Sequence, residues 1–145
     1  MELHVVNHLN PPFELGNRAF DTTWWLEAAD ALNKDRHQYI SFRQNSIEVA
    51  RAAMTTTTLG LNYLDLKEPF DVMEIVLFEV HSELRRTGTG CSSIRLLEEH
   101  YAGQPLAAFS HDADHFWSAI GWQPYPKIKT DMSSALLFLQ NRVHC

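Results

Sequence analysis

The sequence is poor in cysteine, glycine and proline, and it has no long apolar run. Its 145 residues include two cysteines, six glycines and six prolines. Two cysteines cannot form a framework of disulfides, and a chain of this length can bury a core without one. So little glycine and proline excludes a collagen-like or low-complexity disordered chain. No apolar run approaches the roughly 18 residues of a membrane span, so we expect one globular domain over residues 1–145 and no membrane partner.

Basic residues are also few, with 12 Lys and Arg against 18 Asp and Glu and a net charge of −6. Proteins that bind nucleic acid across their surface carry an excess of positive charge. The composition therefore predicts no nucleic-acid partner. The first residues, Met1 to His8, lack the basic segment and apolar core of a signal peptide. We therefore expect a cytoplasmic protein.

Apolar spacing and turn residues predict alternating strands and helices. Val72–Val80 is apolar on both faces, which is typical of a central buried strand. The Thr55–Thr58 run reads as a strand end that enters a loop, and Ser110 or Asp112 can cap the third helix. The predicted strands are Leu3–Val6, Tyr39–Arg43, Ile47–Thr55, Val72–Val80, Leu106–Ser110 and Leu136–Leu139, and the predicted helices are Thr22–Lys34, Cys91–Tyr101 and a segment through Phe116 and Ala119. This order predicts an α/β or α+β sheet covered by helices.

The strongest local signal is a loop between the central strand and the second helix, Arg85-Arg86-Thr87-Gly88-Thr89-Gly90. A glycine-rich turn at a helix start aims backbone N–H groups at an anion, and the helix dipole adds positive potential there. The two arginines supply guanidinium groups that fit phosphate oxygens. An ordinary tight turn is the alternative. A P-loop is excluded because the G-x-x-x-x-G-K-[ST] pattern is absent, and Ser93 stands where a dinucleotide-binding loop needs glycine or alanine.

This loop resembles the R/Q-x-x-G-x-G/A signature of the GNAT superfamily of acyl-CoA-dependent N-acyltransferases. Its surroundings strengthen the resemblance, because Phe116-Trp117-Ser118-Ala119-Ile120-Gly121-Trp122 is similar to the family's F-Y-x-x-L-G-F segment. The resemblance covers about residues 47 to 125, and the first 46 residues match in the order of elements only. It implies a mixed, mostly antiparallel sheet of about six or seven strands flanked by helices. It also implies acetyl transfer from acetyl-CoA to a primary amine of a small molecule or peptide, and homodimers are common in the family.

The resemblance also assigns residues to the donor site. The loop amides hold the CoA pyrophosphate, the strand before the loop offers main-chain groups to pantetheine, and a main-chain N–H near Leu77 or Phe78 polarises the thioester carbonyl. The residues expected to bind acetyl-CoA are Phe78, Val80, Arg85, Arg86, Thr87, Gly88, Thr89, Gly90, Cys91 and Phe116.

A base must take the proton of the amine, because an alkyl ammonium cannot attack a thioester. Glu74 is our candidate, since a carboxylate among Val, Met, Ile and Leu should have a raised pKa, and some family members carry their base at the matching position. Glu79 is the second candidate. In a regular strand the two point to opposite faces unless a bulge intervenes. The alternative for Glu74 is contact with solvent or with Arg51.

Several features have competing interpretations. Trp117 stands where the family often has a tyrosine that protonates the leaving thiolate, and tryptophan is no general acid. This departure favours the alternative of a weak or inactive acyl-CoA-binding module that acts as a sensor or partner subunit. His111 and His115 have metal-ligand spacing, but we expect surface and capping roles and no metal. We read Cys91 as a packing residue. Of Trp24 and Trp25, one is expected in the core, and the other is expected either in the acceptor cleft or in the core as well.

Overall fold

The structure, a computed structural model, describes residues 1–6, 18–31, 37–60, 68–125 and 136–140. Its elements follow the order β1 (Glu2–Val6), α1 (Thr22–Ala31), β2 (His37–Gln44), β3 (Ile47–Leu59), β4 (Phe70–Val80), the 3-10 helix η1 (Ser82–Leu84), α2 (Thr89–His100), β5 (Leu106–Phe109), α3 (Asp114–Ala119), β6 (Gln123–Tyr125) and β7 (Leu137–Leu139). The described strands form one seven-stranded sheet in the order β1-β2-β3-β4-β5-β7-β6. Among the described strands, only β4 and β5 pair in parallel. The predicted mixed, mostly antiparallel sheet is therefore confirmed.

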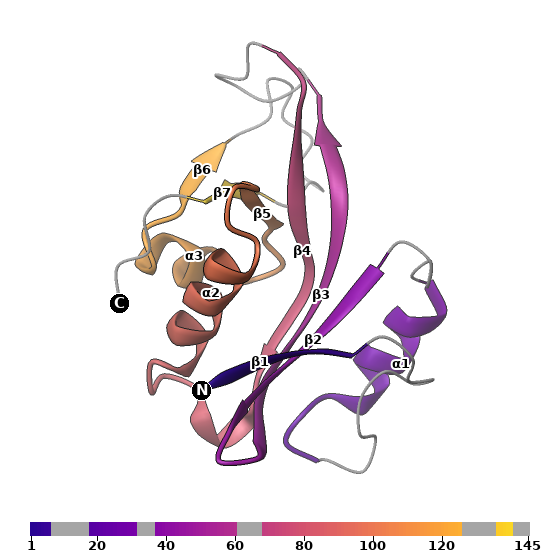
Figure 1. Cartoon of the computed structure of the whole chain (residues 1–145), viewed down its shortest axis with the longest axis vertical. Coiled ribbons are helices and arrows are strands. Elements are labelled where there is room, and N and C mark those ends of the chain that lie inside the picture. Colours follow the sequence, from indigo (N-terminus) through magenta and orange to yellow (C-terminus); the bar gives the residue numbers. More distant parts are fainter. Residues whose placement is uncertain (7–17, 32–36, 61–67, 126–135, 141–145) are drawn as a thin grey trace.

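The sheet has α1 on one face and α2 with α3 on the other (Figure 1). The larger core lies on the α2 side, where Ile94 and Leu97 of α2 pack against Phe42, Met54 and Ile75 of the sheet. The α1 face has a smaller cluster of Phe20, Trp25, Tyr39 and Ala53. Both faces of the central strands are therefore covered, which explains why β4 is apolar on both sides.

The strand β3 runs through the threonine run instead of ending there. Thr55 pairs with Glu74 and Thr58 pairs with Asp71, and the strand continues to Leu59. The prediction of a loop at Thr55–Thr58 was wrong. Threonine is β-branched and suits an extended strand, and the long partner strand β4 gives the run its hydrogen-bonding partner.

Two other expectations need correction. The helix α3 begins at Asp114 with Ala113 at its N-cap, so neither Ser110 nor Asp112 caps it. The Ser110 hydroxyl instead accepts a hydrogen bond from the Ala113 N–H at 3.2 Å. The short strand β6 was not predicted, because three residues that include Pro124 carry no period-2 signal. The end of the first helix expected at Lys34 lies outside the described residues.

A β-bulge in β4 decides which residues share a face. Leu77 is opposite Ala53 and Ile75 is opposite Met54, so Val76 has no partner in β3. Met73 and Ile75 before the bulge and Phe78 and Val80 after it all contact the core on the α2 side. Glu74 and Glu79 therefore both lie on the α1 face, because neighbouring residues of a strand alternate between faces.

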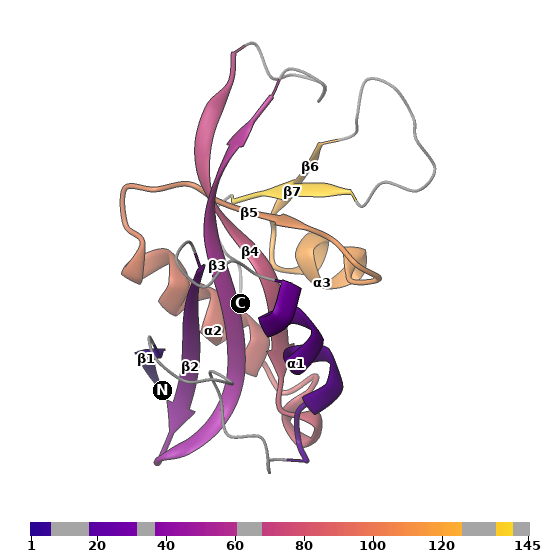
Figure 2. The same cartoon turned by 90° about the vertical axis from the view of Figure 1, so that its right-hand side faces the viewer.

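Beyond the bulge, β4 and β5 separate. Their pairing is confined to Met73–Ile75 of β4 and Leu106–Ala108 of β5. Figure 2 shows β5, β7 and β6 turning away from the lower part of β4.

Within the part of the chain that the structure describes, no helix combines the length and the apolarity needed to cross a bilayer.

Candidate active site

A cavity of about 500 Å³ lies where β4 and β5 separate. One wall is β4 from Ile75 to Val80, and the other is the segment from Phe109 to α3. The residues that line it are Trp24, Ile75, Val76, Leu77, Phe78, Glu79, Val80, Arg85, Phe109, His111, Asp112, Ala113, Phe116 and Trp117. The cavity thus joins the bulge, the start of the glycine loop and α1.

The glycine loop presents the start of α2 without a side-chain cap. Gly88 is the N-cap residue, with φ +87°, and no described side chain caps the helix there. The first helical hydrogen bond runs from the Ser92 N–H to the Gly88 carbonyl at 3.0 Å. The N–H groups of Thr89 and Gly90 therefore have no acceptor within the helix, and they point along its positive end. This arrangement suits an anion.

Gly90 allows the loop to approach the cavity wall closely. A Cβ at this position would lie 2.9 Å from Phe116 Cε2 and 3.4 Å from Val80 Cγ2. The Phe116 ring stacks on Phe78, with ring centroids 5.8 Å apart. Of the residues expected to bind acetyl-CoA, Phe78, Val80, Arg85 and Phe116 line the cavity. A side chain at position 90 would displace this wall.

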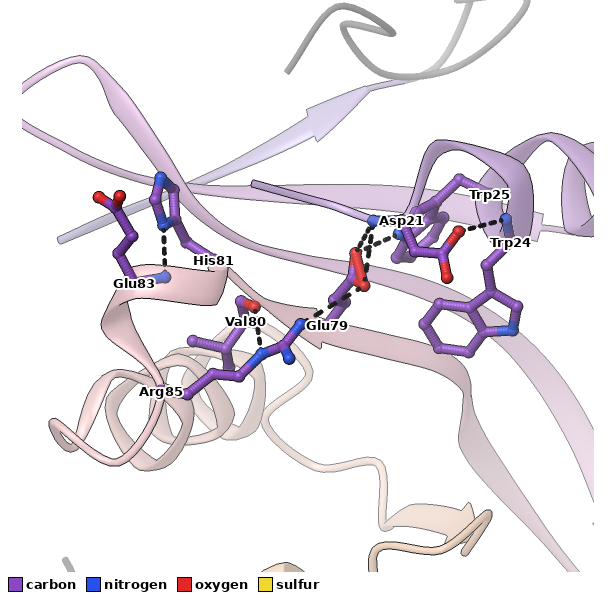
Figure 3. Close-up of polar contacts among 8 residues, drawn as sticks. All are labelled: Asp21, Trp24, Trp25, Glu79, Val80, His81, Glu83 and Arg85. Carbon is purple, nitrogen blue, oxygen red and sulfur yellow. Dashed lines mark hydrogen bonds and ion pairs between the residues drawn. The ribbon is translucent and has the colours of Figure 1, made fainter. Parts of the chain in front are cut away.

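Arg85 places a cation at the end of the cavity. Its Nε donates to the Val80 carbonyl at 3.3 Å, and its guanidinium lies 3.9 Å from Glu79 Oε2 (Figure 3). The side chain is 58% exposed, so most of its donors face solvent. Arg86 is exposed, with φ +62°, and it does not line the cavity.

The remaining loop side chains hold the shape of the turn. The Thr87 hydroxyl donates to the Leu84 carbonyl at 2.5 Å and lies 3.0 Å from the Thr89 hydroxyl. Cys91 packs against the core, as expected, and its sulfur is disulfide-bonded. The cysteine therefore presents no thiolate at the helix start.

Glu79 joins β4 to the start of α1. Its carboxylate is 9% exposed. It accepts hydrogen bonds from the Asp21 N–H at 2.8 and 3.2 Å and from Trp25 Nε1 at 3.1 Å (Figure 3). Its oxygens are thus occupied, and this geometry argues against a role as base. The same contacts hold Trp25 in the core and leave Trp24 lining the cavity.

Glu74 has the electrostatics of a base but stands just outside the cavity lining. Burial raises the pKa of its carboxyl, and the hydrogen bond from Thr57 Oγ1 at 3.4 Å and the positive potential of His37 and His111 lower it in part. A carboxylate with a raised pKa holds a proton more strongly. The alternative of a contact between Glu74 and Arg51 finds no support, because Arg51 Nε pairs with Glu48 at 2.7 Å and the guanidinium lies over the Phe20 ring. Sequence alone gave no signal for that buried pair.

The opposite wall carries His111, Asp112 and Trp117. Trp117 is 5% exposed and stacks on Trp122, and no tyrosine is among the described residues that line the cavity. His115 is exposed on α3 and does not line it. The described residues contain no group of three or more His, Cys, Asp or Glu that could hold a metal ion.

No protein-family model and no curated protein matches the sequence. Solved structures do match. The N-acetyltransferase YlbP of Bacillus subtilis, in complex with coenzyme A, has a TM-score of 0.61 at 15% identity, over 96% of each chain. An acetyltransferase of Thermus thermophilus has a TM-score of 0.62 at 15% identity, over 97% of each chain. AtaT complexed with acetyl-methionyl-tRNA has a TM-score of 0.62 at 12% identity, over 94% of this chain and 92% of that chain.

Proposed function

This chain has the fold of the GNAT acetyltransferases, and we propose that it transfers an acetyl group from acetyl-CoA to a primary amine by direct attack on the thioester. The observation that carries the proposal is the cavity between β4 and β5. It begins at the bulge and ends at Arg85, beside the uncapped start of α2. The coenzyme A in the YlbP structure supports a donor of this class.

The residues present fit such a donor. The N–H groups of Thr89 and Gly90 have no acceptor within the helix, and Gly90 leaves room for the Phe116 ring. Arg85 adds a largely exposed guanidinium next to them. A pyrophosphate carries negative oxygens that match these donors, and the apolar rings of Phe78 and Phe116 suit the chain that follows it. In the proposal, Arg85 to Cys91 bind the pyrophosphate, and Phe78, Val80 and Phe116 bind the pantetheine.

The chemistry requires a polarised carbonyl and a proton acceptor. The bulge leaves the main chain at Val76 without a partner in β3, and we assign an N–H of this segment to the thioester carbonyl. Glu74 lies on the α1 face of the sheet, and burial raises the pKa of its carboxyl. We assign to Glu74 the role of final acceptor of the proton that the attacking amine loses.

The acceptor is a primary amine in this proposal. AtaT, whose structure holds an acetylated aminoacyl-tRNA, shares the fold. The carrier of the amine is therefore not restricted to small molecules and peptides, although the net charge of −6 gives an RNA no general attraction.

The test is thermal unfolding with and without acetyl-CoA, with free CoA and ATP as controls. A ligand at 100 times its Kd adds about 2.7 kcal/mol, which raises the Tm of a domain this size by about 5–10 °C. Both CoA species should shift the Tm and ATP should not. Release of CoA thiol with a panel of primary amines then measures transfer. Binding without thiol release from any amine would favour a binding module, and no shift with either CoA species would overturn the proposal.

A further inference from the structure

The proposed transfer needs a group inside the cavity that can both take and give a proton, and the lining offers few. Among the described lining residues, the titratable side chains are Glu79, Arg85, His111 and Asp112. The Glu79 oxygens accept three hydrogen bonds from α1 and its preceding residue. Arginine keeps its charge at all working pH values, and a carboxylate is in general a weaker base than an imidazole. His111 alone has the chemistry for both directions near neutral pH.

The position of His111 links the cavity to Glu74. The histidine follows β5, on the wall opposite the bulge, and lines the cavity. Glu74 does not line the cavity, but it lies on the α1 face of β4 and pairs with Ala107 of β5. His111 and His37 are the two histidines whose positive charge, when they are protonated, lowers the pKa of the Glu74 carboxyl. Among the described residues that line the cavity, His111 is therefore the one that acts electrostatically on Glu74.

We propose that His111 is a catalytic residue that carries protons between the cavity and Glu74, so that Glu74 acts through it. The inference rests on the proposed acetyl transfer. His111 takes one proton from the ammonium group of the acceptor and passes it to Glu74, which leaves a neutral amine. The amine nitrogen forms a bond to the thioester carbon, and the carbon–sulfur bond breaks with its electron pair on sulfur. His111 takes the second proton from nitrogen and gives it to sulfur, and Glu74 returns the first to solvent.

This role also accounts for Trp117. A tyrosine at that position would protonate the leaving thiolate, whereas an indole N–H does not do so. Within the described lining, the imidazole of His111 supplies the missing acid. His111 is exposed, so solvent can reach its imidazole between turnovers.

The experiment compares His111→Gln with His115→Gln, a matched change of an exposed histidine outside the cavity lining. In a first measurement that needs no acceptor, carbon NMR follows the titration of the Glu74 carboxyl. Because the cation at position 111 lowers the pKa of Glu74, His111→Gln should raise that pKa and His115→Gln should leave it unchanged. An unchanged Glu74 titration in His111→Gln would overturn the proposal.

The second measurement is kcat for thiol release with the first amine that the wild type acetylates. General acid–base catalysis contributes about 10²–10⁴-fold, so we expect at least a 10-fold loss in His111→Gln, with acetyl-CoA affinity unchanged. The double variant Glu74→Gln/His111→Gln should be no slower than the slower single variant, because the two residues form one path. Wild-type kcat in His111→Gln would overturn the relay and leave acetyl transfer standing. A wild type that neither binds acetyl-CoA nor releases thiol would instead overturn the proposed function.

Discussion

Replacement of Glu79 by alanine should destabilise the protein through two hydrogen bonds that fasten α1. The carboxylate is 9% exposed and accepts from the Asp21 N–H and from Trp25 Nε1, at 2.8 and 3.1 Å. A donor that loses its partner costs about 1–3 kcal/mol. Trp25 is fully buried, whereas Asp21 is exposed and its N–H can regain water. We therefore expect a loss of about 2–4 kcal/mol in the free energy of unfolding.

The assay is urea unfolding followed by tryptophan fluorescence, supported by a Tm that falls by about 5–10 °C. Glu79→Gln keeps one acceptor oxygen and should lose about half as much. Glu83→Ala, an exposed carboxylate on η1, is the control and should change stability by less than about 0.5 kcal/mol. If Glu79→Ala unfolds like Glu83→Ala, the reasoning that Glu79 fastens α1 is refuted. If folded Glu79→Gln loses kcat while both substrates still bind, Glu79 acts as the base after all.

Three further outcomes are expected. Gly90→Ala places a Cβ 2.9 Å from Phe116 Cε2 and should weaken acetyl-CoA binding at least 10-fold, as measured by calorimetry. An unchanged affinity would show that the Phe116 ring moves aside without cost to binding. Burial raises the pKa of Glu74 above its ordinary 4.5, so the folded chain holds this proton more tightly than the unfolded chain, and stability falls as pH rises from 4.5 through the raised value. Glu74→Gln should therefore raise the Tm at pH 7 and leave it unchanged below about pH 4, and a lower Tm at pH 7 would contradict this. Trp25→Phe removes the Nε1 donor to Glu79 and also part of a fully buried ring, so it should cost about 2–4 kcal/mol in urea unfolding; no loss would mean that neither the bond nor the ring packing stabilises α1.

Local patterns predicted most of the elements, because hydrophobic period, glycine and proline act over a few residues. The strand at Val72–Val80 and the loop from Arg85 to Gly90 lie where the sequence placed them. The prediction of a loop at the threonine run was wrong because the run pairs with a strand far away in the sequence. Thr55–Thr58 has strand propensity but no apolar alternation, and its partner strand β4 is distant in the sequence. Strand β6 has three residues, too few to show a period.

The candidate site likewise combines features that the sequence predicts with features that only the tertiary structure shows. Gly88, Gly90 and Arg85 were recognisable as a candidate anion-binding loop, because a helix start, glycine freedom and guanidinium chemistry are local properties. The alternation of a strand is also local, and it would place Glu74 and Glu79 on opposite faces. The bulge at Val76 reverses that result. A bulge depends on how two strands fit together, so no pattern within β4 alone reveals it.

By itself, the sequence determined the class of fold, the order of the main elements and the position of the glycine loop to which we assign phosphate binding. The tertiary structure alone decided that β4 and β5 separate beyond Ile75 and Ala108 and enclose a cavity. It also decided that Glu79 fastens α1 and that His111, not Glu74, lines the cavity. These outcomes depend on contacts between residues far apart in the chain. Their geometry is set by sheet twist and packing, which residue-by-residue propensities do not contain.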